Sequence, residues 1–180
     1  MPIPGNHPGA LDEIALLAGL LAQPGADSLE ALHDLLPRAP WLQGAVAELA
    51  ALPLAQWQGE HTRLFLNGVP RTPCPPFASA WRKGTMGGDI ATAARLLFRQ
   101  AGLEPRGELP PDYLGTLLEG AALLASRGDA PSGALLERLW QEQILPWVPD
   151  WAQALEQASG LLLYRVLARR LAILLGDGAS

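Results

Sequence analysis

The stretch LAQWQGEHTRLF occupies residues 54–65 and carries a helical pattern. Its large side chains recur with i, i+4, i+7 and i+8 spacing, at Trp57, His61, Leu64 and Phe65. That spacing places them on one face of a helix, which can then pack against a core. We therefore predict an amphipathic helix that begins at Leu54 and runs into Asn67-Gly68.

Similar patterns recur on both sides of this stretch, separated by proline and glycine. A first helix is expected to begin near Leu11 and to end before Pro24. Further helices are expected over residues 29–36, 45–52, 89–102, 112–126, 132–145, 150–158 and 160–175. Leu and Ala dominate the chain and β-branched residues are scarce, which favours helix over strand. The sequence predicts an all-α, single-domain helical bundle over residues 1–180, with a candidate hinge near residues 103–111.

The segment VPRTPCPPFASAWRKGTMGG, residues 69–88, interrupts the helical patterns. Its many prolines and glycines argue against a regular element, although it retains Phe77 and Trp81. It is therefore predicted to be a long ordered loop. Long loops in small domains are more often functional than short connections are, so a site is expected nearby.

Composition and charge argue against several kinds of partner. The formal net charge is -5 and the pI is about 5.1, which leaves no basic surface of the sort that binds nucleic acid. Cys74 is the single cysteine of the chain, so neither an intramolecular disulfide nor a cysteine metal cage can form. A reducing compartment fits this composition.

Secretion and membrane insertion are not expected either. The first residues lack a positively charged opening, and Asp12 and Glu13 directly precede the first apolar stretch. The apolar stretch over residues 14–22 is too short to span a bilayer, and the stretch over residues 161–175 is interrupted by arginines. We therefore expect a cytoplasmic protein without stable membrane insertion.

No arrangement of catalytic or metal-binding residues is found in the sequence. A serine-nucleophile motif is missing, and His7, His33 and His61 stand in unrelated contexts. Cys74 lies between two prolines, which excludes the helix start that commonly activates a thiol. Neither His-x-x-x-His nor Cys-x-x-Cys spacing is present. We expect no catalytic residues and no metal.

The turn over residues 84–89 leaves one alternative open, because it places glycines directly before an expected helix. A phosphate-binding loop would follow a strand and end in Lys with Ser or Thr. This turn follows a proline-rich segment and ends in Asp89, whose carboxylate repels anions and can cap a helix. A helix-entry turn is the favoured interpretation, and a nucleotide-hydrolysing enzyme is the alternative.

Three separated segments resemble the TorD/DmsD/NarJ family of redox-enzyme maturation chaperones. Residues 60–65, EHTRLF, and 75–81, PPFASAW, are similar to the family's E-Y-x-x-L-F helix and P-P-Y-E-S-V-Y/W loop. Residues 111–119, PDYLGTLLE, resemble P-D-H-L-G-x-E-L-E, and residues 143–151, QILPWVPDW, resemble H-L-x-P-W-x-P-x-F. The chain departs from these patterns at His61, Ala78, Tyr113, Leu117 and Gln143.

The resemblance implies a chaperone rather than an enzyme, with the helical fold of that family and no required cofactor. It implies that the partner is the twin-arginine signal peptide of a molybdenum-containing oxidoreductase, or the N-terminal segment of its catalytic subunit. Binding would delay export or membrane assembly until the cofactor is loaded. A structural adaptor within a redox complex is a further alternative. The chain is expected to be a monomer or a domain-swapped dimer.

A twin-arginine leader combines guanidinium groups with an apolar stretch, so its receptor needs an apolar groove with carboxylates at one end. With the family resemblance, the expected groove residues are Leu64, Phe65, Phe77 and Trp81, and Glu60, His61 and Tyr113 border them. Asp112 and Glu119 are candidates to pair with arginines, since seven residues separate them on roughly one helical face. For each residue a structural role competes: core packing for the apolar side chains and helix capping for Asp112.

Overall fold

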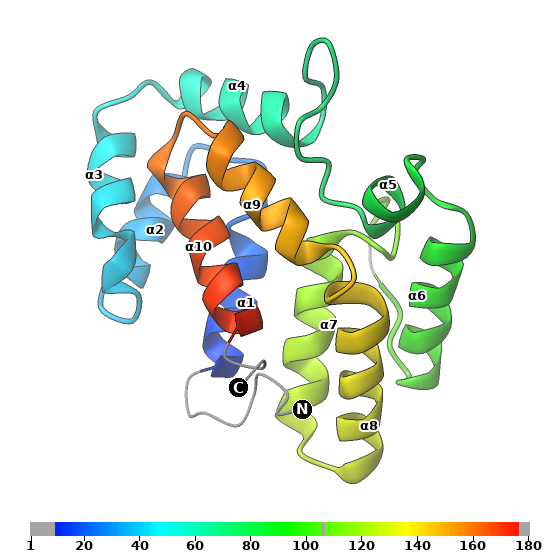
Figure 1. Ribbon diagram of the computed structural model, residues 1–180. Coiled ribbons are helices and arrows are strands. Elements are labelled where there is room, and N and C mark those ends of the chain that lie inside the picture. Colours follow the sequence, from blue (N-terminus) through cyan, green and yellow to red (C-terminus); the bar gives the residue numbers. More distant parts are fainter. Residues whose placement is uncertain (1–9, 106, 177–180) are drawn as a thin grey trace.

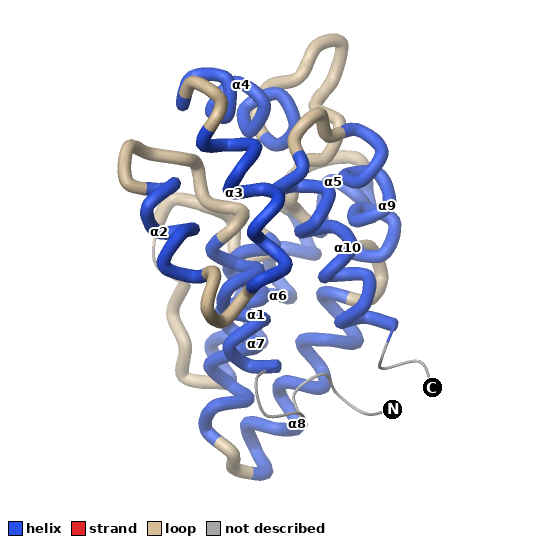
Figure 2. Tube along the Cα trace, turned by 90° about the vertical axis from the view of Figure 1, so that its left-hand side faces the viewer, coloured by secondary structure: helices blue, strands red, loops and turns tan. Residues whose placement is uncertain are grey.

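The computed structural model describes residues 10–105 and 107–176, so His7, the N-terminal opening and Arg106 of the candidate hinge lie outside the described residues (Figure 1). The described residues form ten α-helices and no strand, which confirms the predicted all-α single domain. The helices are α1 Ala10–Gly19, α2 Ser28–Leu35, α3 Gln43–Ala50, α4 Leu54–Phe65, α5 Ala78–Lys83, α6 Gly88–Gln100, α7 Leu114–Arg127, α8 Ala130–Leu139, α9 Val148–Ala158 and α10 Leu162–Gly176. A 3₁₀ turn, Pro40–Leu42, precedes α3, and a π-helical turn, Trp140–Ile144, follows α8. Figure 2 shows these helices joined by loops throughout the described chain.

The centre of the bundle is made by α1, α7, α9 and α10. Helix α1 packs on α7, α7 on α8, and α9 on α10. In Figure 1, α2 and α3 lie on one side of this centre, and α5 and α6 on the other. Leu17, Leu118, Leu155 and Leu167, one from each central helix, have no exposed surface. Burying a leucine side chain contributes roughly 1.5–3 kcal/mol, so these contacts dominate the stability of the fold.

The predicted long loop over residues 69–88 is wrong in part, because α5 begins directly after Phe77. The prolines of the segment lie before this helix, and Gly84 ends it with a left-handed φ of 73°. The helix is supported from a distant part of the chain, since the Ser79 amide donates to Asp112 Oδ2 over 2.8 Å. Residues 66–76, which precede Phe77, form no helix, as predicted for the proline-rich part.

Two predicted helix starts are also corrected. Asp112 was expected to cap the helix that follows it, but α7 begins at Leu114, with Tyr113 at the cap position, and Asp112 binds the start of α5 instead. Asp89 was expected to open its helix, but it lies in the first turn of α6 and pairs with Lys83 over 2.8 Å. In both places, contacts between neighbouring segments decide where the carboxylate points.

No helix in the described ranges is long and apolar enough to cross a membrane.

Candidate functional site

The three motif segments meet at one place, between α4, α5, α7 and α9. Trp151 Nε1 donates to the Cys74 carbonyl over 3.1 Å, and the Cys74 amide donates to the Leu64 carbonyl over 2.9 Å. The Leu114 amide donates to the Pro76 carbonyl over 2.8 Å. We call residues 60–65, 74–81, 112–114 and 147–151 the motif junction. Residues far apart in the sequence are thus tied together by backbone and indole hydrogen bonds.

Asp112 lies at the centre of the motif junction and has no exposed surface. Its Oδ2 accepts from the Ser79 amide, and its backbone carbonyl accepts from the Ala78 amide over 3.1 Å. Its Oδ1 has no hydrogen-bond partner among the described residues. Asp112 therefore holds the start of α5 against the start of α7, and its side chain is closed off from a ligand in this conformation.

His61 and Tyr113 converge on one backbone carbonyl, that of Leu21, just beyond α1. His61 Nε2 lies 3.1 Å from the Leu21 oxygen, and the Tyr113 hydroxyl donates to the same oxygen over 3.2 Å. A carbonyl only accepts, so Nε2 of His61 carries the proton, and the buried Nδ1 is left without a described partner. Burial lowers the pKa of His61, which keeps the ring neutral near neutral pH. Burial, aided by the nearby Glu119 charge, raises the pKa of Tyr113 to about 12.

The apolar residues predicted to line a groove lie inside the core in this conformation. Leu64 is 0% exposed, Phe65 3% and Phe77 5%. The Phe65 ring stacks on Trp151 with centroids 6.1 Å apart. Trp81 is half-buried, and its Nε1 donates to the Pro75 carbonyl over 2.8 Å. Their contact with a peptide stays a prediction, and their present contacts shape the motif junction.

The Glu60 carboxylate also has its partners within the fold. Its carboxylate pairs with Arg63 over 2.7 Å and accepts from the Gly160 amide over 2.7 Å, and Arg63 donates to the Ala158 carbonyl. Burial acts to raise the pKa of Glu60, but the Arg63 and Gly160 hydrogen bonds outweigh it, so the pKa lies below its ordinary value. The two side chains fasten α4 to the turn between α9 and α10.

Glu119 differs from the other predicted site residues, because it is exposed and lines an open pocket. This pocket, of about 250 Å³, lies between α7, the end of α6 and the connector that follows α6. A second pocket of about 750 Å³ adjoins it. The two share Leu103, Glu104, Pro105 and Leu123, and we call them together the α6–α7 groove.

The α6–α7 groove was not predicted as a site from the sequence. The connector over residues 103–111 drew attention only as a candidate hinge. Leu109 and Leu123 line the groove and are 51% and 47% exposed. From the sequence alone, an apolar residue on a helix or connector is expected to be buried in the core, so neither leucine was noticed. Gly120, a glycine inside an expected helix, is the one feature of the sequence that could have pointed to this region. In the structure a Cβ at this position would clash with the Phe98 ring. This glycine leaves room for the Phe98 ring of α6 to lie against α7 beneath the groove.

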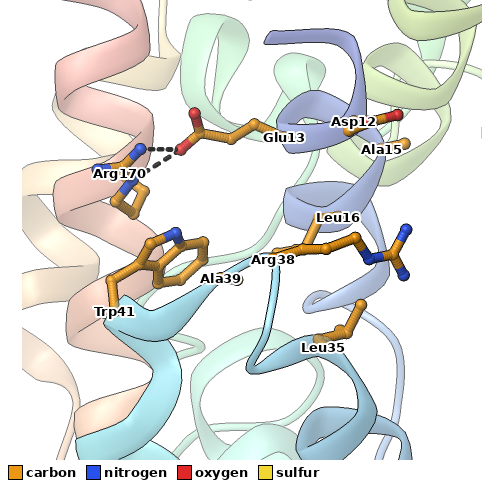
Figure 3. Close-up of a pocket in the computed structure, with 9 residues that line it drawn as sticks. All are labelled: Asp12, Glu13, Ala15, Leu16, Leu35, Arg38, Ala39, Trp41 and Arg170. Carbon is orange, nitrogen blue, oxygen red and sulfur yellow. Dashed lines mark hydrogen bonds and ion pairs between the residues drawn. The ribbon is translucent and has the colours of Figure 1, made fainter. Parts of the chain in front are cut away.

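A third pocket, of about 590 Å³, lies elsewhere, between α1, α2, the 3₁₀ turn and α10 (Figure 3). None of the predicted site residues lines it. Arg170 pairs with Glu13 over 2.6 Å, and its guanidinium carbon lies 5.3 Å from the Trp41 ring centroid. The Glu13 and Arg170 charges on this wall are therefore already paired with each other.

Three observations concern the thiol, metal and nucleotide chemistry that the sequence analysis considered. Burial raises the pKa of Cys74 to about 11, so its thiol stays protonated. No group of three His, Cys, Asp or Glu side chains within the described ranges could hold a metal ion. At the glycine turn, the Gly87 amide donates to Ser79 Oγ over 2.8 Å, so this amide is not free for a phosphate. The observation favours the helix-entry turn.

Comparison with known proteins gives concordant matches. The model of the nitrate reductase delta subunit family matches residues 19–153. The chaperone protein YcdY of Escherichia coli is 26% identical over 115 residues, which cover 64% of this chain and 59% of YcdY. The Tat proofreading chaperone DmsD of Salmonella typhi is 32% identical over 123 residues, which cover 66% of this chain and 56% of DmsD. The chain thus spans less than two thirds of the length of these curated relatives.

The fold also matches a solved structure. A crystal structure of a proposed redox enzyme maturation protein from Archaeoglobus fulgidus superposes with a TM-score of 0.68 and 24% identity. The match covers 92% of this chain and 93% of the other. At this identity the likeness concerns the fold.

Proposed function

The chain belongs to the nitrate reductase delta subunit family, and from that membership we propose that it is a chaperone for the maturation of a molybdenum-containing oxidoreductase. In this proposal it binds the twin-arginine signal peptide or the N-terminal segment of the client, in the cytoplasm and without turnover. Binding delays export or assembly until the cofactor is loaded. The observation that carries the proposal is the family match over residues 19–153, which contains all three motif segments.

The α6–α7 groove is the binding surface that fits this function best. It offers the two features that a basic, apolar leader requires, namely apolar walls and carboxylates. Leu103, Pro105 and Leu123 supply apolar surface, and Glu104 and Glu119 supply the carboxylates. Both acids are exposed and neither makes a hydrogen bond or ion pair among the described residues. They are therefore available to arginines of a client.

The motif junction holds the helices that form the two walls of this groove. The Ser79–Asp112 and Leu114–Pro76 hydrogen bonds fix the first turn of α7, and Glu119 lies on the same helix one turn further on. Helix α5 in turn packs on α6, which forms the other wall. In this proposal Asp112 positions the groove and does not touch the peptide, whereas Glu119 does.

The direct test is calorimetric titration with the leader peptide of a molybdenum-containing oxidoreductase from the same organism. We expect micromolar or tighter affinity, on the order of -8 kcal/mol. A leader with both arginines replaced by glutamine is the control and should bind at least about tenfold more weakly. If neither this leader nor the N-terminal segment of the mature enzyme binds, the proposed function is wrong.

The variant Glu104→Gln with Glu119→Gln tests the groove itself. We expect weaker leader binding and a flatter dependence of affinity on salt, because two charge-assisted contacts are lost. The matched control is Glu30→Gln with Glu137→Gln, which changes the net charge equally on exposed faces of α2 and α8. Equal affinities for both double variants would remove the groove acids from the site.

A further inference from the structure

The wall of the α6–α7 groove opposite Glu119 carries two arginines, Arg95 and Arg99. They lie four residues apart on α6, hence on one face, and both line the larger pocket of the groove. Both are exposed, and neither donates a hydrogen bond or forms an ion pair among the described residues. The larger pocket therefore holds two positive charges without described partners beside the Glu104 carboxylate, on a chain whose formal net charge is -5.

Most other arginines in the described ranges are used inside the fold. Arg63, Arg138 and Arg169 pair with carboxylates, and Arg127 donates to the Ala101 carbonyl over 2.7 Å. Like charges one helical turn apart repel each other, so the Arg95–Arg99 arrangement does not stabilise α6. An acidic ligand lying between the two guanidinium groups would relieve this repulsion.

The surroundings of the two arginines are apolar. Leu103, Leu109, Pro111 and Leu123 line the same pocket, and the two exposed leucines among them face solvent without a cover in the described chain. Glu104 also lines the pocket but is paired with neither arginine. An inorganic anion would leave the exposed leucines uncovered. An acidic side chain flanked by apolar ones would both pair with the arginines and cover the leucines.

We propose that Arg95 and Arg99 bind a carboxylate-bearing, apolar segment of a polypeptide client, distinct from the basic segment assigned to Glu104 and Glu119. Guanidinium groups bind carboxylates through paired hydrogen bonds, which fixes the geometry of the acidic residue. Its apolar neighbours pack on Leu109 and Leu123. This inference rests on the proposed function only in taking the ligand to be a polypeptide.

The test uses a fluorescein-labelled synthetic peptide of Leu, Ala and Gly that carries two glutamates one helical turn apart. A matched peptide carries glutamine at these two positions. Fluorescence polarisation should show the glutamate peptide binding about tenfold more tightly than the glutamine peptide. Arg95→Gln with Arg99→Gln should abolish the preference for glutamate.

The matched control is Arg38→Gln with Arg71→Gln, which removes two exposed arginines that also lack described partners and lie outside the groove. The control should keep the preference for glutamate. Equal binding of the glutamate and glutamine peptides overturns the proposal, as does equal weakening by the two double variants. Displacement of the glutamate peptide by an equal concentration of inorganic phosphate would overturn the choice of a carboxylate ligand.

The leader titration, run on the same protein, separates the two proposals. If the leader binds and the glutamate peptide does not, the Arg95–Arg99 site is wrong while the chaperone function stands. If the glutamate peptide binds in an arginine-dependent way and no leader does, the site stands and the leader function is wrong. Circular dichroism melting of each double variant confirms that these exposed substitutions leave the fold intact.

Discussion

The motif junction and the α6–α7 groove lie next to each other. They differ in whether their polar side chains have hydrogen-bond or ion-pair partners within the described chain. In the motif junction, Asp112, His61 and Glu60 bond to backbone groups or to a neighbouring side chain. In the groove, Glu104, Glu119, Arg95 and Arg99 are exposed and have no bonded partner in the described chain. Buried polar groups without bonds are costly, whereas exposed charges are free to meet a ligand. Most residues that carry the family resemblance therefore hold the fold together, and the exposed charges of the groove, Glu119 among them, are the ones that we propose to contact a ligand.

The largest expected effect is a difference in the free energy of unfolding between a variant of the motif junction and a variant of the groove. Trp151→Ala removes a fully buried indole and its bond to the Cys74 carbonyl, and should lower the free energy of unfolding by about 3–5 kcal/mol. Leu123→Ala in the groove removes a half-exposed side chain and should cost less than about 1 kcal/mol. Urea unfolding followed by circular dichroism measures both. Similar losses for the two variants would contradict the division between motif junction and groove.

A smaller effect is expected at Asp112. Asp112→Ala leaves the buried Ser79 amide without its acceptor and should destabilise the fold by about 1–3 kcal/mol. Asp112→Asn keeps an acceptor oxygen and should cost less. Glu119→Ala should leave the unfolding transition unchanged and weaken leader binding. The prediction is contradicted if Asp112→Ala is as stable as the unaltered chain and loses leader affinity alone.

The helices were predictable because their signals are local. The spacing of Trp57, Leu64 and Phe65 depends on one helix, and proline or glycine marks most of its neighbours' ends. Helix α5 was missed because its support is not local: an amide at Ser79 is held by a carboxylate from Asp112, thirty-three residues later. The same contact explains why the predicted cap of α7 was wrong. A sequence shows which residues can cap a helix but not which amide will be nearest.

The groove that we propose is of the kind that the sequence predicted, but its apolar residues are different ones, and peptide contact of the residues named from the sequence stays a prediction. Apolar surface beside carboxylates was expected, and Glu119 was named, but the apolar partners were placed at Leu64, Phe65 and Phe77, which the structure buries. A large apolar residue on an amphipathic helix looks the same in a sequence whether it faces the core or a ligand. Leu109 and Leu123 became visible only through their exposed fractions. Arg95 and Arg99 likewise became notable only once the partners of the other arginines were known.

Two departures from the family pattern gain a shared physical reason in the structure. His61 stands where the pattern has an aromatic residue, and Tyr113 stands where it has histidine. The two rings meet at the Leu21 carbonyl, and each contributes one donor to it. In this chain the contact thus contains one imidazole and one phenol ring.

The third prediction concerns pH. The folded state lowers the pKa of His61 below its ordinary value of 6.5, so the unfolded chain takes up the proton first as the pH falls. Stability is therefore unaffected above that value and decreases below it, with a slope of at most about 1.4 kcal/mol per pH unit from this group. Urea unfolding at a series of pH values between about 8 and about 5 measures the slope.

Two variants show whether the slope belongs to the motif junction. His61→Gln should flatten it, because the amide does not titrate. His33→Gln changes an exposed histidine of α2 and should leave the slope unchanged. A slope that survives His61→Gln would mean that another group causes the loss of stability in acid.

The smallest effect is expected at Tyr113. Tyr113→Phe removes one of the two donors to the Leu21 carbonyl and should cost about 0.5–1.5 kcal/mol, at the lower end because His61 still satisfies that oxygen. Adding His61→Phe would leave the carbonyl without either donor, so the double variant should lose more than the sum of the single variants. The exchange His61→Tyr with Tyr113→His retains two donors at the same oxygen and should be more stable than His61→Phe with Tyr113→Phe. Strictly additive losses, measured by urea unfolding above pH 7 where His61 is neutral, would show that the two rings contribute independently and that their reciprocal identities are not coupled through Leu21.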